Sequence, residues 1–163
     1  MQQAPAQIAE QEHYGAAEKQ IRKSQDLDVP VSDRQMLKFR LEQAAATLFQ
    51  HFQIQASRQE QAQFLRYLPG DYFKAHRDWT DQEIYRDRIL SLVLFLNDHS
   101  DPEGFKGGRF SFLLPHPADS ERLLGVPIYP QTGLLIAFRP QLLHEVSPVT
   151  AGQRYTVVTW LSR

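Results

Sequence analysis

The pattern of apolar residues changes once along the chain, near residue 54, and the two parts predict different secondary structure. Before this point, apolar residues recur at helical spacing, at Leu37, Leu41, Ala45, Leu48 and Phe52. We expect a helix over residues 32–52 whose apolar stripe lies against a sheet. Ser32 and Gln35 fit a capping box at its start. Val31 and Met36 occupy the two positions of a hydrophobic staple.

After residue 54 the chain consists of short segments rich in Val, Ile, Phe, Tyr and Thr, separated by Pro, Gly, Asp or Asn. The predicted strands are residues 64–68, 73–78, 89–97, 109–114, 124–129, 134–138, 144–149 and 154–162. About eight strands with no helix between them predict a mainly β fold with flanking helices. A barrel or a two-sheet jelly roll, with helices packed on one outer face, satisfies this order.

The N-terminal part carries less information. Residues 1–20 are rich in Gln, Ala and Glu, and we expect either a helix or a disordered segment there. Residues 21–31 contain Pro30 and predict a short strand or an extended connector, because the residue before a proline avoids the helical conformation. With no repeat or second domain in the pattern, we expect a single domain over residues 21–163.

Composition and charge exclude several classes of function. Eighteen basic and nineteen acidic residues leave a formal charge of -1, and no basic stripe with interleaved aromatic residues predicts nucleic-acid binding. The absence of cysteine excludes disulfides, thiolate zinc sites and cysteine nucleophiles. The longest apolar run, residues 92–96, is too short to span a bilayer, and the N-terminus lacks the pattern of a signal peptide. We therefore expect a cytoplasmic protein without a membrane or nucleic-acid partner.

Candidate metal ligands begin with the motif His76-x-Asp78. In an extended segment, residues two apart point to the same face, so this imidazole and carboxylate would lie side by side. They form two-thirds of a 2-His-1-carboxylate site, the ligand set of non-haem Fe(II) oxygenases. Three histidines are candidates for the third ligand: His99 in a segment of turn composition, His116 between two prolines in a loop, and His144 at the start of a strand.

Arg154 is the candidate anion anchor. Strand alternation places it on one face with Thr156, Val158 and Trp160, and no acidic residue shares that face. If this face is buried, the guanidinium needs an anionic ligand, and Arg154 could bind a carboxylate in bidentate fashion while Thr156 adds a hydroxyl donor. If it faces solvent, Arg154 is simply hydrated. The pattern leaves both orientations open.

Taken in order, these residues resemble a known family. Tyr67, His76-x-Asp78, Gly107-Gly108-x-Phe110, His144 and Arg154-x-Thr156 ahead of Trp160 resemble the prolyl 4-hydroxylase type of Fe(II)/2-oxoglutarate dioxygenase. The resemblance extends from about residue 22 to the C-terminus. It implies a double-stranded β-helix core, of the jelly-roll or cupin-like kind, packed by the N-terminal helices.

The resemblance also implies roles for individual residues. His76, Asp78 and His144 would bind Fe(II) and form the catalytic centre. Arg154 would hold the distal carboxylate of 2-oxoglutarate, with Thr156 and Tyr67 assisting. Two further residues match positions that line the substrate groove of this family, Arg88 and Trp160.

Two departures from the collagen-type members place the chain nearer the bacterial and oxygen-sensing branches. Those members carry Lys at the position of Arg154, and they often carry Ser at the position of Thr156. Both differences preserve the physical role of the residue. Asp78 is retained, whereas halogenating relatives lack this carboxylate and hold chloride instead, which favours hydroxylation.

The activity that the resemblance implies is hydroxylation of a C–H bond with O2, while 2-oxoglutarate is converted to succinate and CO2. Ascorbate is the expected reductant. The favoured substrate is a prolyl residue in a peptide or protein. The alternatives are a free amino acid or other small metabolite, and a catalytically silent barrel used as a binding module. A silent barrel would be expected to lose a metal ligand or the anion anchor, and this chain keeps them all.

Overall fold

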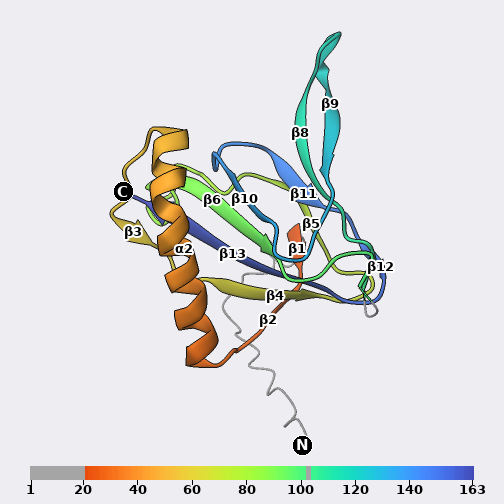
Figure 1. The fold of residues 1–163 in the computed structure, drawn as a ribbon. Coiled ribbons are helices and arrows are strands. Elements are labelled where there is room, and N and C mark those ends of the chain that lie inside the picture. Colours follow the sequence, from red (N-terminus) through yellow and green to blue (C-terminus); the bar gives the residue numbers. More distant parts are fainter. Residues whose placement is uncertain (1–20, 102–103) are drawn as a thin grey trace, which may run out of the picture.

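The computed structural model describes residues 21–101 and 104–163. The expected N-terminal helix or disordered segment at residues 1–20 lies outside the described residues. Within them, helix α2 (Val31–Phe52) precedes most of the strands (Figure 1). The strands are β1 (Arg22–Lys23), β2 (Gln25–Asp26), β3 (Arg58–Gln59), β4 (Gln63–Tyr67), β5 (Tyr72–His76), β6 (Arg88–Phe95), β7 (Lys106–Gly107), β8 (Phe110–His116), β9 (Asp119–Ile128), β10 (Leu135–Phe138), β11 (His144–Val146), β12 (Val149–Ala151) and β13 (Arg154–Ser162).

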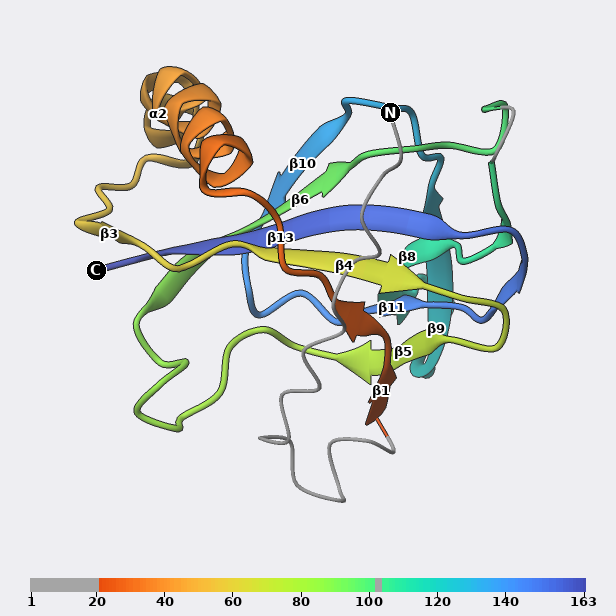
Figure 2. The ribbon, with the colours of Figure 1, turned by 90° about the horizontal axis from the view of Figure 1, so that it is seen from below.

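The strands form two main antiparallel sheets. One has the order β1-β5-β11-β8-β9, and the other has the order β10-β6-β13-β4-β2, with β3 also paired to β13. A short ladder joins β12 to β7. Sequence neighbours such as β4 and β5 lie in different sheets, so the chain passes repeatedly from one sheet to the other (Figure 2). This arrangement confirms the predicted mainly β fold and its double-stranded β-helix core.

Two apolar cores follow from strand alternation. Residues of both sheets meet in the inner core, among them Leu65, Phe95, Phe110 and Val146. The opposite face of the six-stranded sheet packs against α2 in an outer core that contains Leu41, Leu90, Leu92 and Leu161. Successive residues of β6 therefore alternate between the inner core and the helix, as a strand covered on both faces requires.

The predicted strands are all present, with differences at their ends. The strand expected over residues 144–149 is divided into β11 and β12, which pair with different neighbours. Pro148 lies between them, and a proline has no N–H to continue a ladder. Strand β9 begins at Asp119, earlier than predicted, and its hairpin with β8 projects from the body of the molecule (Figure 1). His116, expected in a loop, is the last residue of β8.

The predicted start of the helix is wrong in its details. Pro30 is the N-cap residue, and no side chain caps the helix. The Pro30 carbonyl accepts hydrogen bonds from the backbone N–H groups of Asp33 and Arg34. Val31 and Met36 are 68% and 57% exposed, so they form no staple. The helix is held instead by its packed apolar stripe, which is the usual source of helix stability in proteins. No described helix has the length and apolar character needed to cross a membrane.

Candidate metal centre

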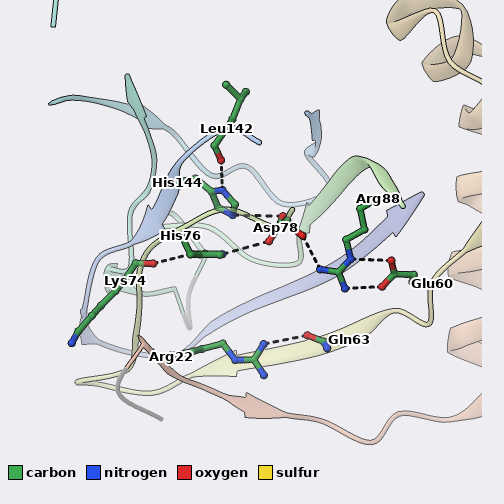
Figure 3. A network of polar contacts seen from close by, with 9 residues as sticks. All are labelled: Arg22, Glu60, Gln63, Lys74, His76, Asp78, Arg88, Leu142 and His144. Atoms are coloured by element: carbon green, nitrogen blue, oxygen red, sulfur yellow. Dashed lines mark hydrogen bonds and ion pairs between the residues drawn. The ribbon is translucent and has the colours of Figure 1, made fainter. Parts of the chain in front are cut away.

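His76, Asp78 and His144 converge at one end of the five-stranded sheet. His76 ends β5, Asp78 follows two residues later, and His144 begins β11 directly opposite His76 in the antiparallel ladder. One candidate ligand atom from each residue lies within 4.8 Å of the others. The Asp78 carboxylate lies beside the two rings and faces both, with Oδ1 3.5 Å from Nε2 of His76 and Oδ2 3.7 Å from Nε2 of His144 (Figure 3). This spacing suits a single divalent ion.

The two imidazoles are oriented by their own strands. Nδ1 of His76 lies 2.8 Å from the carbonyl oxygen of Lys74, and Nδ1 of His144 lies 2.9 Å from that of Leu142. An N–H at Nδ1 donates to each carbonyl, so the lone pair of each ring is at Nε2, on the side of Asp78. Phe73 stacks on the ring of His76 with centroids 3.5 Å apart. Main-chain oxygens thus orient both rings by hydrogen bonding, and aromatic side chains pack against them.

The protonation states also suit a metal. Burial lowers the pKa of His144, although the charge of Asp78 partly opposes this shift. Burial alone would raise the pKa of Asp78, but the rings of His76 and His144, when protonated, outweigh burial, and the pKa lies below its ordinary range. A neutral imidazole and an ionised carboxylate are the forms that bind a divalent cation. Two neutral nitrogen donors and one carboxylate fit Fe(II) with open coordination positions.

Arg154 faces the interior and is 1% exposed, which decides between the two orientations that its sequence left open. Its Nη1 donates to Oγ1 of Thr156 at 3.2 Å, and its Nε has no hydrogen-bond partner among the described residues. Its guanidinium lies over the rings of Tyr67 and Phe95, at 5.0 and 5.4 Å from their centroids. Burial lowers the pKa of Arg154 and the nearby Tyr67 opposes this shift, but arginine remains charged in proteins. No carboxylate of residues 21–101 or 104–163 forms an ion pair with it, so the site fits an anionic ligand.

One cavity joins the metal centre to the anion anchor. It holds about 460 Å³ of empty space, its open mouth included. Its lining contains all but one of the residues to which the family resemblance gave a role, namely Tyr67, His76, Asp78, His144, Arg154, Thr156 and Trp160. Their individual roles in binding stay predictions.

Arg88 is the exception. It does not line this cavity, because its guanidinium is engaged by Glu60 in a two-pronged ion pair. A role as a substrate contact stays a prediction that this geometry does not favour. The other candidate histidines lie apart from the metal centre: His99 is exposed in a turn, and His116 ends β8 in the projecting hairpin.

Sequence reasoning missed two polar residues of the cavity wall, Arg22 and Gln63. Arg22 Nη1 donates to Oε1 of Gln63 at 3.2 Å (Figure 3). Gln63 could have been found, because strand alternation places it on the same face as Leu65 and Tyr67. Arg22 could not, because its position depends on the pairing of β1 with β5, which no local pattern predicts.

The fold and the site define the class of protein: a double-stranded β-helix with a His-Asp-His triad and a buried arginine in one cavity. In agreement, the sequence model of the 2OG-Fe(II) oxygenase superfamily matches residues 62–162. The chain belongs to this superfamily, which implies Fe(II), 2-oxoglutarate and O2. The family expected from the sequence is confirmed.

Curated relatives and solved structures agree with this membership. A PKHD-type hydroxylase from Rippkaea orientalis is 32% identical over 101 residues, which are 60% of this chain and 40% of the relative. A PKHD-type hydroxylase from Shewanella baltica is 32% identical over 103 residues, or 60% of this chain and 41% of the relative. The chain thus spans about 40% of the length that these relatives have.

Among solved structures, a prolyl-4-hydroxylase from Pseudomonas putida matches with a TM-score of 0.66 and 25% identity, over 88% of this chain and 73% of that one. A prolyl hydroxylase from Trichoplax adhaerens, solved with a peptide fragment of the oxygen degradation domain of hypoxia inducible factor, has the same TM-score at 18% identity. That match covers 90% of this chain and 67% of the other, and it shows the shared fold.

Proposed function

We propose that the chain is an Fe(II)- and 2-oxoglutarate-dependent dioxygenase that hydroxylates a prolyl residue in a peptide or protein, with release of succinate and CO2. The observation that carries this proposal is the cavity that holds both the His-Asp-His triad and a buried arginine charge without an acidic partner among the described residues. The hydroxylase names of the relatives and the prolyl hydroxylase neighbours support the choice of reaction.

The roles of the residues follow from their geometry. His76, Asp78 and His144 would hold the iron through Nε2, a carboxylate oxygen and Nε2. Arg154 would bind the distal carboxylate of 2-oxoglutarate through N–H groups that the protein leaves available, including Nε–H. Thr156 accepts a hydrogen bond from Arg154, so its own O–H is directed to donate to the same carboxylate.

When bound, the iron and 2-oxoglutarate together supply the oxidation of the substrate C–H bond by O2. The protein contributes position and shielding. Apolar side chains such as Leu65, Phe73 and Val158 line the cavity and keep water from the buried charges, which strengthens each electrostatic contact. Trp160 completes this wall from the same strand that carries Arg154 and Thr156.

The first test is succinate release from 2-oxoglutarate in air with Fe(II) and ascorbate. We expect release by the parent chain and none by His144→Ala, because the triad then lacks a ligand. His99→Ala is the matched control and should retain release, since this histidine is exposed in a turn. A parent chain that binds iron but releases no succinate would favour the binding module and overturn the proposal.

The second test concerns the substrate. Peptides and small metabolites from a cell extract are treated separately with enzyme, Fe(II) and 2-oxoglutarate and compared by mass spectrometry. We expect one added oxygen atom on prolyl residues of peptides. An added oxygen on a free amino acid or another metabolite, with none on peptides, would replace this substrate class. Dependence on ascorbate and a cytoplasmic location remain predictions, tested by omitting ascorbate and by cell fractionation.

A further inference from the structure

The guanidinium of Arg88 contacts the metal centre from outside the cavity, at the main chain of Asp78. Arg88 begins β6 and is 9% exposed. Its guanidinium lies over two aromatic rings, 3.7 Å from the centroid of Trp160 and 4.5 Å from that of Tyr85. Trp160 is also part of the cavity wall. Arg88 thus supports this wall from outside the cavity.

The hydrogen bonds of Arg88 connect Glu60 to the metal centre. Nε and Nη2 donate to Oε1 and Oε2 of Glu60 at 2.9 and 2.7 Å, the parallel two-bond geometry that arginine forms with a carboxylate. Nη1 donates to the main-chain carbonyl of Asp78 at 3.2 Å. Figure 3 shows this path from Glu60 through Arg88 to Asp78, which faces both histidines.

Glu60 is itself attached to β13 at several points. Its N–H donates to the carbonyl of Trp160 at 2.9 Å, and its own carbonyl accepts a hydrogen bond from Oγ1 of Thr159 at 2.7 Å. Its Oε1 also accepts a hydrogen bond from Oγ of Ser162 at 3.0 Å. The carboxylate that holds Arg88 is therefore fixed to the strand that carries the anion anchor.

Asp78 needs such support because it lies beyond the end of β5. Its N–H donates to the carbonyl of Pro140 at 2.9 Å, and Arg88 holds its carbonyl. The two bonds restrain the peptide groups on both sides of its Cα, and they limit where its carboxylate can lie. Metal ligands must be held to within about 0.5 Å of the binding geometry to be effective.

We propose that Arg88 and Glu60 are a positioning pair for the metal carboxylate: Glu60 fixes the guanidinium of Arg88, and Arg88 fixes the main chain of Asp78 and the ring of Trp160. The pair rests on the proposed function only in taking Asp78 as a metal ligand. It assigns Arg88 to the support of the site in place of contact with substrate. Loss of a group that orients a metal ligand typically weakens metal binding by about 10–100-fold.

The test measures the affinity of the chain for Mn(II), a stand-in for Fe(II) that is stable in air, by calorimetric titration well below the melting temperature. Arg88→Lys keeps the charge but loses the two-bond fork, and Glu60→Gln removes the charge that holds it. We expect each variant to bind Mn(II) about 10-fold more weakly than the parent. The double variant should bind Mn(II) with about the same affinity as the single variant that binds it less tightly, because the two residues act as one unit.

Arg34→Lys is the matched control. Arg34 also donates to a carboxylate, that of Asp28, and to a main-chain carbonyl, that of Ala62, but it does not line the cavity. Its Mn(II) affinity should equal that of the parent. Ser162→Ala, which removes only one hydrogen bond to Glu60, is a milder variant for the case that the others do not fold, and it should weaken Mn(II) binding to a smaller but measurable extent.

The positioning pair is refuted if the variants at Arg88, Glu60 and Ser162 bind Mn(II) within about 2-fold of the parent, or if they lose no more affinity than Arg34→Lys. A parent chain that binds no Mn(II) overturns the pair and the proposed function together. A parent chain that binds Mn(II) in this pattern but releases no succinate overturns only the proposed function. Normal succinate release with unchanged Mn(II) affinity in the variants overturns only the pair.

Discussion

Arg154 carries a positive charge into an apolar interior, where its guanidinium lies over the rings of Tyr67 and Phe95 and forms no ion pair with an acidic residue among those described. A buried charge of this kind is costly in the free protein. This cost is offset only when an anion binds. Arg154 therefore lowers the stability of the ligand-free protein and raises that of the complex with an anion.

Replacement of Arg154 by Met should therefore separate stability from binding. We expect Arg154→Met to melt at the same temperature as the parent or higher, because the desolvated charge is gone. Its affinity for 2-oxoglutarate should fall by about 10-fold or more, because the charge-assisted hydrogen bonds are lost. Thermal melts and titration with 2-oxoglutarate in the presence of Mn(II) measure the two effects. Equal affinity in the variant and the parent would show that the cosubstrate binds elsewhere.

At the scale of residues, His76 and Asp78 were candidates because period-two alternation would place them on one face of an extended segment, although β5 ends at His76 and Asp78 lies beyond it. The choice of His144 over His99 and His116 required the family resemblance. Arg88 shows which contacts spacing along the sequence does not predict. Its position at the start of a strand is visible in the sequence, but its partner Glu60 is 28 residues away, and no local pattern indicates that contact.

At the scale of elements, α2 depends on its buried stripe and not on its ends. Leu41 is 7% exposed and packs in the outer core with Leu90, Leu92 and Leu161. We expect Leu41→Ala to lower the free energy of unfolding by about 2–4 kcal/mol, because it leaves a cavity under the helix. Met36, 57% exposed on the same helix, is the control, and Met36→Ala should change stability by less than about 0.5 kcal/mol. Urea unfolding measures both, and similar losses would contradict this account.

A turn after β6 depends on the ionised form of Asp98. Its Oδ1 accepts hydrogen bonds from Oγ and N of Ser100 at 2.6 and 2.7 Å, and its Oδ2 accepts one from N of Thr132 at 3.1 Å. These bonds, that of the Ser100 hydroxyl first, lower the pKa of Asp98 from its ordinary value of 3.8. A carboxyl group whose pKa is lower in the folded state stabilises the fold above its unfolded pKa, and this contribution is lost as the pH falls below it.

Asp98→Asn should therefore melt at a lower temperature than the parent at neutral pH. Between about pH 5 and about pH 3 the variant should lose less stability than the parent, because it lacks a group that takes up a proton on unfolding. Thermal melts across this range test the prediction. Parallel curves for the two proteins would show that the turn does not depend on this charge.

Most elements were predictable because period-two and period-3.6 patterns depend on local geometry. The ends of these elements were less predictable. The helix starts at Val31, and the carbonyl of Pro30 accepts hydrogen bonds from the N–H groups of Asp33 and Arg34, whereas the capping box predicted side-chain bonds at Ser32 and Gln35. Pro148 divides the predicted strand at residues 144–149, a break that the proline alone could have indicated.

At the scale of the whole molecule, the cavity is lined by residues of both sheets. The histidines come from β5 and β11 of one sheet, and Arg154 comes from β13 of the other. An anion that contacted both the bound metal and Arg154 would therefore connect the two sheets. The strand pattern does not show that these residues come from different sheets; that expectation came from the fold that the family resemblance implies.

Joint binding should therefore stabilise the molecule more than the separate ligands do. We expect Mn(II) and 2-oxoglutarate together to raise the melting temperature by more than the sum of their separate effects. Each ligand present at about 100 times its dissociation constant contributes about 2.7 kcal/mol. Differential scanning fluorimetry measures the shifts, and His144→Ala should abolish the excess. A purely additive result would indicate that the two ligands bind without contact.

The way in which the two imidazoles are oriented has an evolutionary consequence. Each ring donates its Nδ1 hydrogen to the peptide oxygen two residues before it, at Lys74 and at Leu142, and every amino acid supplies that oxygen. We therefore expect the side chains at positions 74 and 142 to be free to diverge without loss of these hydrogen bonds of the proposed iron ligands. An orienting contact of this kind leaves no trace in residue identity, and it becomes visible only when the backbone itself is traced.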